Sequence, residues 1–218
     1  MAAYFQLILD TTAPTGGSIS LPASASSVNI TATLSATGAT YMKLYGDICA
    51  SAGGAAIAEA DASWIAYNTS ASIILTSGDG TKTVYAKFKD DVGNETSTAV
   101  SASTVLDTSA PIVTIVGPDV GTISKVSGYN VSAFSFSANE AFVEWTVRVV
   151  PSADSAHTAG TEIPTTGGST NMHGTTTTAA STAISCSIYG ADLETASSGD
   201  GTKIVKVFVK DANGNWSV

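Results

Sequence analysis

The sequence predicts an all-β protein built from two tandem β-sandwich domains. Three observations support this prediction: a long internal repeat, short segments in which apolar and polar residues alternate, and a composition rich in Ser, Thr, Gly and Ala. The 218 residues suffice for one large or two ordinary domains. Hydrophobic residues make up 44% of the chain and charged residues 12%, a balance typical of a folded chain and not of a disordered one.

The internal repeat sets the predicted domain boundaries. Three short sequences of the first half return in the second: LDTTAP at 9–14 as LDTSAP at 106–111, SGDGTKTV at 77–84 as SGDGTKIV at 198–205, and KDDVGN at 89–94 as KDANGN at 210–215. The second copy is longer by about 24 residues, which we assign to a Thr-, Gly- and Ser-rich stretch at 151–182. We therefore expect an N-terminal arm at 1–9, one domain at 10–105 and a second at 106–218.

Strands are predicted where the side-chain pattern has a period of two. Residues 28–34 place their apolar side chains on one face, and residues 83–89 place Val84, Ala86 and Phe88 on the face toward the core. The matching strand at 204–210 is expected to turn its valines inward and Phe208 outward. A helix is not predicted anywhere; residues 50–62 are the one candidate for a helical turn, although two glycines within them oppose a long one.

A tryptophan and two cysteines belong to the expected cores. Trp145 lies in an alternating segment at 143–149 and is predicted to be buried, with Lys43 as its nearest counterpart in the first copy. Cys49 and Cys186 fall one in each copy, so neither can form a bridge between the sheets of one domain. They are expected to be free, half-buried thiols, which suits a reducing compartment.

The turn residues fit the same architecture. Pro14 and Pro111 open each copy, where a residue without an N–H belongs at the entry to an edge strand. An Asp-Gly pair precedes the strongest strand of each copy, and a Gly-Asn pair follows it. With these motifs the chain resembles the bacterial and bacteriophage immunoglobulin-like repeat modules over nearly its whole length. The resemblance implies an immunoglobulin-like sandwich, but such modules occur in adhesins, enzyme spacers and virion proteins alike.

A calcium site is the first candidate for a functional site. In some large adhesins of this type, aspartates at module junctions hold Ca²⁺, and the resemblance places such ligands at Asp90, Asp91 and Asp107, with the Asn94 carbonyl beside them. Ca²⁺ takes six to eight oxygen ligands. The alternative, which the missing EF-hand spacing favours, is a turn closed by the aspartate side chain with no metal.

The long stretch at 151–182 is the second candidate, as a recognition loop. Its expected contact residues are His157, Thr158, Asn171, Met172 and His173. The two histidines lack further ligands at a spacing diagnostic of zinc, so we expect them to be solvent-exposed. Four aromatic residues of the first copy are considered as platforms for sugars, although core packing is the commoner role of a tryptophan: Tyr41, Tyr45, Trp64 and Tyr67.

The third candidate is an assembly site made by the N-terminal arm. The first copy has room for a seventh strand at 98–105, whereas the second copy continues for only a few residues beyond Asn215. The arm contains an apolar strand, with Tyr4, Phe5, Leu7, Ile8 and Leu9, that aligns with residues 101–106. We expect head-to-tail assembly in which this strand completes the second domain of a neighbour. The alternatives are pairing within its own domain and docking on another protein.

Composition and motifs narrow the function. The net charge is −9 and the nine basic residues are scattered, which disfavours nucleic acid and anionic membranes as partners. Neither a catalytic motif nor a transmembrane segment is found, nor is a cofactor expected apart from the calcium considered above. The sequence favours a non-catalytic virion protein of a bacteriophage, such as a capsid-decoration, head-fibre or tail-associated subunit, assembled in the host cytoplasm. Its partners would be virion proteins, its own copies and a host glycan. The alternative is an adhesin or carbohydrate-binding fragment of a larger protein on the bacterial cell surface.

Overall fold

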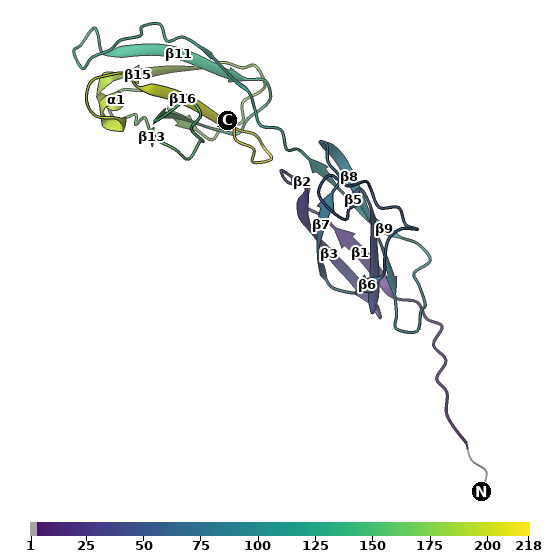
Figure 1. The fold of residues 1–218 in the computed structure, drawn as a ribbon. Helices are drawn as coiled ribbons and strands as arrows, with labels where there is room; N and C mark the ends of the chain where they lie inside the picture. The colour runs from purple at the N-terminus through teal and green to yellow at the C-terminus, as the bar shows by residue number, and fades with distance from the viewer. Residues whose placement is uncertain (1–3) are drawn as a thin grey trace. The chain divides into compact units, whose positions relative to one another are not determined.

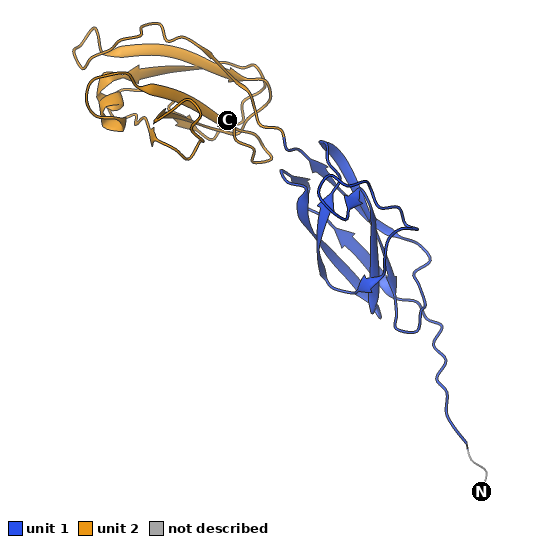
Figure 2. Cartoon of the chain, in the orientation of Figure 1, with its two compact units in different colours: residues 1–108 blue, residues 109–218 orange. Residues whose placement is uncertain are grey.

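A computed structural model describes residues 4–218 of the chain and confirms the predicted all-β class. The chain divides into two compact units, residues 1–108 and residues 109–218 (Figure 2). Strands supply nearly all of the regular structure, and a short α1 (Gly190–Ala196) is the one helix among the described residues (Figure 1). None of the helical structure in 4–218 is long and apolar enough to span a membrane.

Unit 1 is a sandwich of two sheets. The first sheet has the order β1-β3-β7-β5, and the second has the order β2-β9-β8-β4-β6. The strands of the first sheet are β1 (Thr15–Ser20), β3 (Asn29–Thr37), β7 (Ser70–Leu75) and β5 (Ile48–Cys49). Those of the second are β2 (Ser24–Ala25), β9 (Val100–Leu106), β8 (Gly80–Lys89), β4 (Tyr41–Gly46) and β6 (Ile65–Ala66). This is the strand arrangement of an immunoglobulin-like sandwich. β9 takes the place of the last, seventh strand of that fold, and the short β2 and β6 are additional to it.

The core of unit 1 follows from the alternation in its sequence. Val84, Ala86 and Phe88 on β8 are buried, as predicted, and pack against Leu34 and Leu75 of the opposite sheet. Successive side chains of a strand point to opposite faces, so each strand supplies every second residue to the core and leaves Ser, Thr or Lys outside.

Unit 2 is a sandwich of the same kind with fewer long strands. One sheet has the order β10-β11-β15, and in the other β12 pairs with β13 and β14 along one edge and with β16 along the other. The first sheet contains β10 (Val113–Val116), β11 (Val131–Ala138) and β15 (Ile184–Tyr189). The second contains β12 (Glu144–Val150), β13 (Thr161–Glu162), β14 (His173–Gly174) and β16 (Ile204–Lys210).

Trp145 lies in the core of unit 2, as predicted. Its ring is 6.3 Å from that of Phe136 and 6.2 Å from that of Phe142, and its indole N–H donates to the Asn171 carbonyl at 3.1 Å. The prediction that Lys43 is its counterpart in unit 1 is wrong by one residue. Trp145 pairs with Val209 across the sheet, and the repeat places Met42, which pairs with Phe88, at that position.

Phe208 is buried, contrary to the outward position that the alternation predicts. The outer face of β16 is covered by the loop that follows β12. The ring of His157, in that loop, lies edge-on to Phe208 with ring centroids 6.5 Å apart and stacks on Trp216 with centroids 4.5 Å apart. Thr146, which follows Trp145 on β12 and points to the other face, is also buried, and its hydroxyl donates to Glu162 of the same covering segment at 3.1 Å. Burial on both faces of β16 therefore replaces the one-sided pattern found in unit 1.

The extra residues of unit 2 are divided among three connections, whereas the sequence comparison assigned them all to 151–182. Residues 151–183 join β12 to β15 and carry the short strands β13 and β14. Residues 190–203, with α1, join β15 to β16, where unit 1 has only residues 76–79 between β7 and β8. The connection at 117–130 is likewise longer than its counterpart at 21–28. Residues 50–62, the candidate helical turn, contain no helix.

Both cysteines are free and buried. Cys49 Sγ lies 3.4 Å from the Leu75 carbonyl, and Cys186 packs in the core of unit 2. Burial raises the pKa of the Cys186 thiol to about 12, so this thiol stays protonated at neutral pH. Both thiols are unpaired, as expected. They are buried, whereas the sequence predicted that they would be only half-buried.

Candidate functional site

The strongest structural difference between the two units is the edge of β16, which has no neighbouring strand along its first residues, although its end pairs with Trp216 and Ser217. In unit 1 the corresponding strand, β8, pairs with β4 on one side and with β9 along seven residues on the other. In unit 2, β16 pairs with β12 and, among the described strands, with no other. A sheet edge presents a row of N–H and C=O groups that can pair with an added strand.

The missing partner changes the conformation of β16 itself. Gly80, Thr81 and Lys82 belong to β8, where they pair with Leu106, Val105 and Thr104 of β9. The same three residue types recur at 201–203, directly before β16, and they are not in a strand. Because the local sequence is identical, the difference arises from the absence of a neighbouring strand and not from strand propensity.

A groove of about 870 Å³ lies beside this edge, with an apolar floor and with Lys125, Glu194, Asp200 and Lys203 also in its lining. Its walls come from both sheets and from α1, and Val205 and Val207 of β16 form part of it. The other large apolar side chains that line it are Ile115, Ile123, Phe134, Ile188 and Leu193. In unit 1, the equivalent space beside β8 is filled by β9, whose Leu106 belongs to the core cluster and whose Ala102 packs against that cluster.

The arm that was expected to fill such a groove is not paired with either unit. Residues 4–9 are assigned to no strand, and the side chains of Tyr4, Phe5, Leu7, Ile8 and Leu9 are between 83% and 96% exposed. The alternative that the arm pairs within its own domain is therefore wrong. A row of five exposed large apolar residues has a high cost in water and is a typical feature of interaction segments.

The opposite edge of that sheet is closed by the long stretch after β12. β13 and β14 pair with β12 at Arg148, Val149, Trp145 and Thr146. Arg148 also donates to the carbonyls of Ala159 and Gly160, each at 2.8 Å. The stretch therefore protects the edge of β12, so β16 provides the accessible edge of this sheet.

The predicted recognition residues do not form one loop. His157 stacks on Trp216 beside β16, with Thr158 exposed next to it. Asn171 donates to the Ser185 carbonyl at 2.6 Å, and His173 contacts Glu162 at 2.8 Å. Met172, directly before β14, is fully buried in the same core cluster as Trp145 and cannot contact a ligand. These residues hold the stretch against the sandwich.

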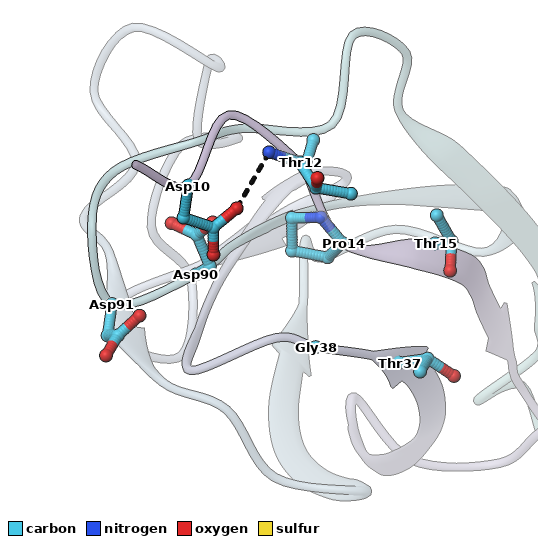
Figure 3. Close-up of a pocket in the computed structure, with 9 residues that line it drawn as sticks. Asp10, Thr12, Pro14, Thr15, Thr37, Gly38, Asp90 and Asp91 are labelled. Atoms are coloured by element: carbon cyan, nitrogen blue, oxygen red, sulfur yellow. Dashed lines mark hydrogen bonds between the residues drawn. The ribbon is translucent and has the colours of Figure 1, made fainter. Parts of the chain in front are cut away.

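The structure does not bring the three aspartates of the predicted calcium site together. Asp90 and Asp91 follow β8, whereas Asp107 follows β9, which runs antiparallel to it and ends beside Gly80 at the other end of the sandwich. The residue that lies beside Asp90 is Asp10, in a pocket of about 300 Å³ that also includes Asp91 (Figure 3). Sequence analysis missed Asp10, although the repeat marks it as the counterpart of Asp107.

Hydrogen bonds within a turn already occupy the carboxylate of Asp90. Oδ1 accepts from the backbone N–H groups of Val92, Gly93 and Asn94, and Oδ2 accepts from the Asn94 side chain at 2.7 Å. Burial alone would raise the pKa of Asp90, but these hydrogen bonds outweigh it and lower the pKa below its usual value. Asp211 and Asn215 repeat the arrangement in unit 2. The KDxxGN motif therefore forms a turn closed by its aspartate in both units.

The aromatic residues considered as sugar platforms have structural contacts. Tyr67 packs edge-on against Phe88, and its hydroxyl accepts from the Ala36 N–H at 3.0 Å. Tyr45 stacks on Tyr85 with ring centroids 5.3 Å apart. Trp64 lies beneath the ammonium groups of two lysines of β4 and β8, and one of those lysines also covers Tyr41. The outer face of β4 and β8 is thus occupied by its own cation–π contacts.

Comparisons with known proteins find likenesses to solved structures. No family model and no curated protein sequence matches it. Similar solved structures include a Ca²⁺-stabilised adhesin of an Antarctic bacterium that binds ice, with 17% identity over 95% of this chain and 48% of that chain at a TM-score of 0.39. A tetra-tandem repeat from the extending region of a large adhesion protein has 20% identity over 92% and 47%, at a TM-score of 0.27.

A chitinase of Bacillus thuringiensis is also similar, with 11% identity over 92% of this chain and 30% of that chain at a TM-score of 0.33. In all three cases this chain spans less than half of the longer structure. Two of the three structures belong to adhesins and the third to a chitinase. Likenesses with TM-scores of 0.39 and below do not bear on the function of this chain.

Proposed function

We propose that this chain is a non-catalytic structural subunit that works by protein–protein assembly. The observation that supports the proposal is the free edge of β16 beside a groove lined by large apolar side chains. Folded proteins usually cover or charge such an edge, because it otherwise recruits further strands. An apolar groove of this size beside an unpaired edge is the feature expected of a surface that is filled on assembly.

The setting that we propose is a bacteriophage virion, in which the partners are copies of the chain and other virion proteins. The net charge of −9 keeps such a subunit soluble before assembly. The second candidate is a module of a bacterial surface adhesin. It is favoured by the repeated DT[TS]AP and KDxxGN motifs, which also occur in adhesin modules, and it would place the chain on the cell surface.

Sedimentation velocity of the purified full chain over a range of concentrations tests the assembly function. We expect species heavier than the 21.9 kDa chain, in proportions that rise with concentration. Ile115→Asp places a charge in the groove and should shift the distribution toward the monomer. Val92→Asp, at an exposed valine of unit 1, is the matched control and should leave the distribution unchanged. A chain that stays monomeric at every concentration contradicts the proposal, as does an assembly that Ile115→Asp does not weaken.

Recovery of the native protein with antibodies distinguishes the virion setting from the adhesin setting. Antibodies against the chain should recover virion proteins from a phage lysate if the first setting is correct. Recovery from the envelope fraction of uninfected cells, as part of a longer polypeptide, would favour the adhesin setting and overturn the virion one.

A further inference from the structure

Unit 1 contains a template for the strand that would complete unit 2. β9 lies antiparallel to β8, with Leu106 opposite Gly80 and Ser101 opposite Tyr85. Leu106 and Thr104 are each 1% exposed, and Ala102 packs against the core. The inward residues of this seventh strand are therefore every second one, ending at the last residue before the link to unit 2.

The repeat gives each of these positions a counterpart. Residues 101–106 correspond to residues 4–9, because LDTTAP at 9–14 and LDTSAP at 106–111 are the same motif. Residues 80–85 correspond in the same way to 201–206, where β16 begins and the groove opens. Transfer of the β8–β9 pairing to these residues places Leu9 opposite Gly201 and Tyr4 opposite Lys206.

In this register the arm presents an apolar face to the groove. Phe5, Leu7 and Leu9 take the inward positions of Ala102, Thr104 and Leu106, while Gln6 and Ile8 face outward. Two of the three side chains are much larger than those they replace, and the groove beside β16 offers about 870 Å³ to receive them. Leu7 also avoids a defect of the template, because the buried hydroxyl of Thr104 has no hydrogen-bond partner among the described residues.

We infer that the groove of unit 2 binds residues 4–9 of a second copy of this chain, added as a seventh strand antiparallel to β16. This inference rests on the proposed assembly function and names its contact. The donated strand would continue through 10–14 into unit 1 of the second copy, just as β9 continues through 107–111 into unit 2 of its own chain. The contact joins the arm of one copy to the groove of another, so it is head-to-tail and generates a closed ring or an open filament.

An engineered disulfide tests the register. Thr83 Oγ1 and Ser103 Oγ lie 2.9 Å apart on the outer face of the β8–β9 pair, and their counterparts are Ile204 and Gln6. The variant with both Gln6→Cys and Ile204→Cys should therefore form disulfide-linked dimers and longer ladders under mild oxidation, which a reductant removes. The matched control joins Gln6→Cys with Lys203→Cys, one residue away and on the opposite face of the strand, and should give no ladder.

Mixing the two single variants distinguishes a contact between two copies from a contact within one chain. An equimolar mixture of Gln6→Cys and Ile204→Cys should yield a linked dimer and nothing longer, because each chain carries one of the two cysteines. A double variant that cross-links only within a monomer would overturn donation between copies, and equal linking in the Lys203→Cys control would overturn the register. The native cysteines are buried and identical in all of these variants.

A pair of arm variants separates this inference from the proposed function. Leu7→Asp should weaken association by at least about 100-fold, because it loses an apolar anchor and forces a carboxylate into the groove. Ile8→Asp, at the outward position next to it, should weaken association by less than about tenfold. If the chain assembles and Ile115→Asp disrupts it, while Leu7→Asp and the cysteine pair have no effect, strand donation is wrong and assembly through the groove stands. A chain that never assembles overturns both.

Discussion

The buried hydroxyl of Thr104 allows a quantitative test of the packing beside β8. Thr104 lies in the middle of β9 with its side chain 1% exposed, and its Oγ1 is a buried polar atom without a hydrogen-bond partner among the described residues. Thr104→Val keeps the β-branched shape and replaces this hydroxyl with a methyl group. The substitution therefore isolates the cost of one unpaired polar group.

The expected gain follows from two terms. An unsatisfied buried hydroxyl costs about 1–3 kcal/mol, and a buried methyl group contributes roughly 0.8 kcal/mol through the hydrophobic effect. Allowing for small packing changes, we expect Thr104→Val to raise the free energy of unfolding of unit 1 by about 1–2 kcal/mol. For a unit of this size the corresponding rise in Tm is about 5–10 °C.

Differential scanning calorimetry of the full chain measures this shift, since the transition of unit 2 provides an internal reference. Thr31→Val, at an exposed position of β3, is the matched control and should change the stability by less than about 0.5 kcal/mol. An unchanged or lower Tm for Thr104→Val would refute the reasoning, because it would mean that the hydroxyl has a partner in solution. The site would then be less apolar than its packing indicates.

Three further predictions concern the aspartates and a cysteine. Asp192 of α1 accepts from the N–H groups of Gly167 at 2.6 Å and Ser169 at 2.8 Å, so Asp192→Ala should lower the stability of unit 2 by about 2–4 kcal/mol in urea unfolding. The hydrogen bonds of Asp90 lower its pKa in the folded chain, so its contribution to stability is fully present above its unfolded pKa of about 3.9 and is lost as the pH falls through the lower folded value. The urea midpoint of Asp90→Asn should therefore depend less on pH in this acidic range than that of the unchanged chain. Cys186, with its pKa raised to about 12 by burial, should resist iodoacetamide at neutral pH and react once the chain is unfolded, as mass spectrometry would show.

Local patterns in the sequence predicted much of the fold. The alternation of Val84, Ala86 and Phe88 fixed which side of β8 is buried, because the side-chain period of a strand does not depend on distant contacts. Trp145 was found by the same reasoning. The strand predicted at 204–210 coincides with β16, whereas the strand predicted at 83–89 extends back to Gly80 in the structure, because β9 pairs with these extra residues.

The errors arise where contacts between distant segments decide the outcome. Phe208 was expected outside because apolar and polar residues alternate along its strand, and in unit 1 the residue at the matching position, Lys87, does lie outside, paired with Glu59. Only the fold reveals that the loop with His157 covers that face of unit 2. The calcium triplet failed in the same way, because Asp107 lies one whole strand away from Asp90. The helix α1 is too short for a helical period to be visible in the sequence.

The burial of both faces of β16 has a consequence for biosynthesis. Valines on one face, Phe208 on the other and an unpaired edge together make a segment that would aggregate if it were exposed on an incomplete chain. Segments that cover it, the stretch after β12 on one face and the earlier strands of the core on the other, precede it in the sequence. Because a ribosome releases the chain from its N-terminus, these covering segments leave the ribosome before β16 does. β16 is thus synthesised after most of the surface that buries it.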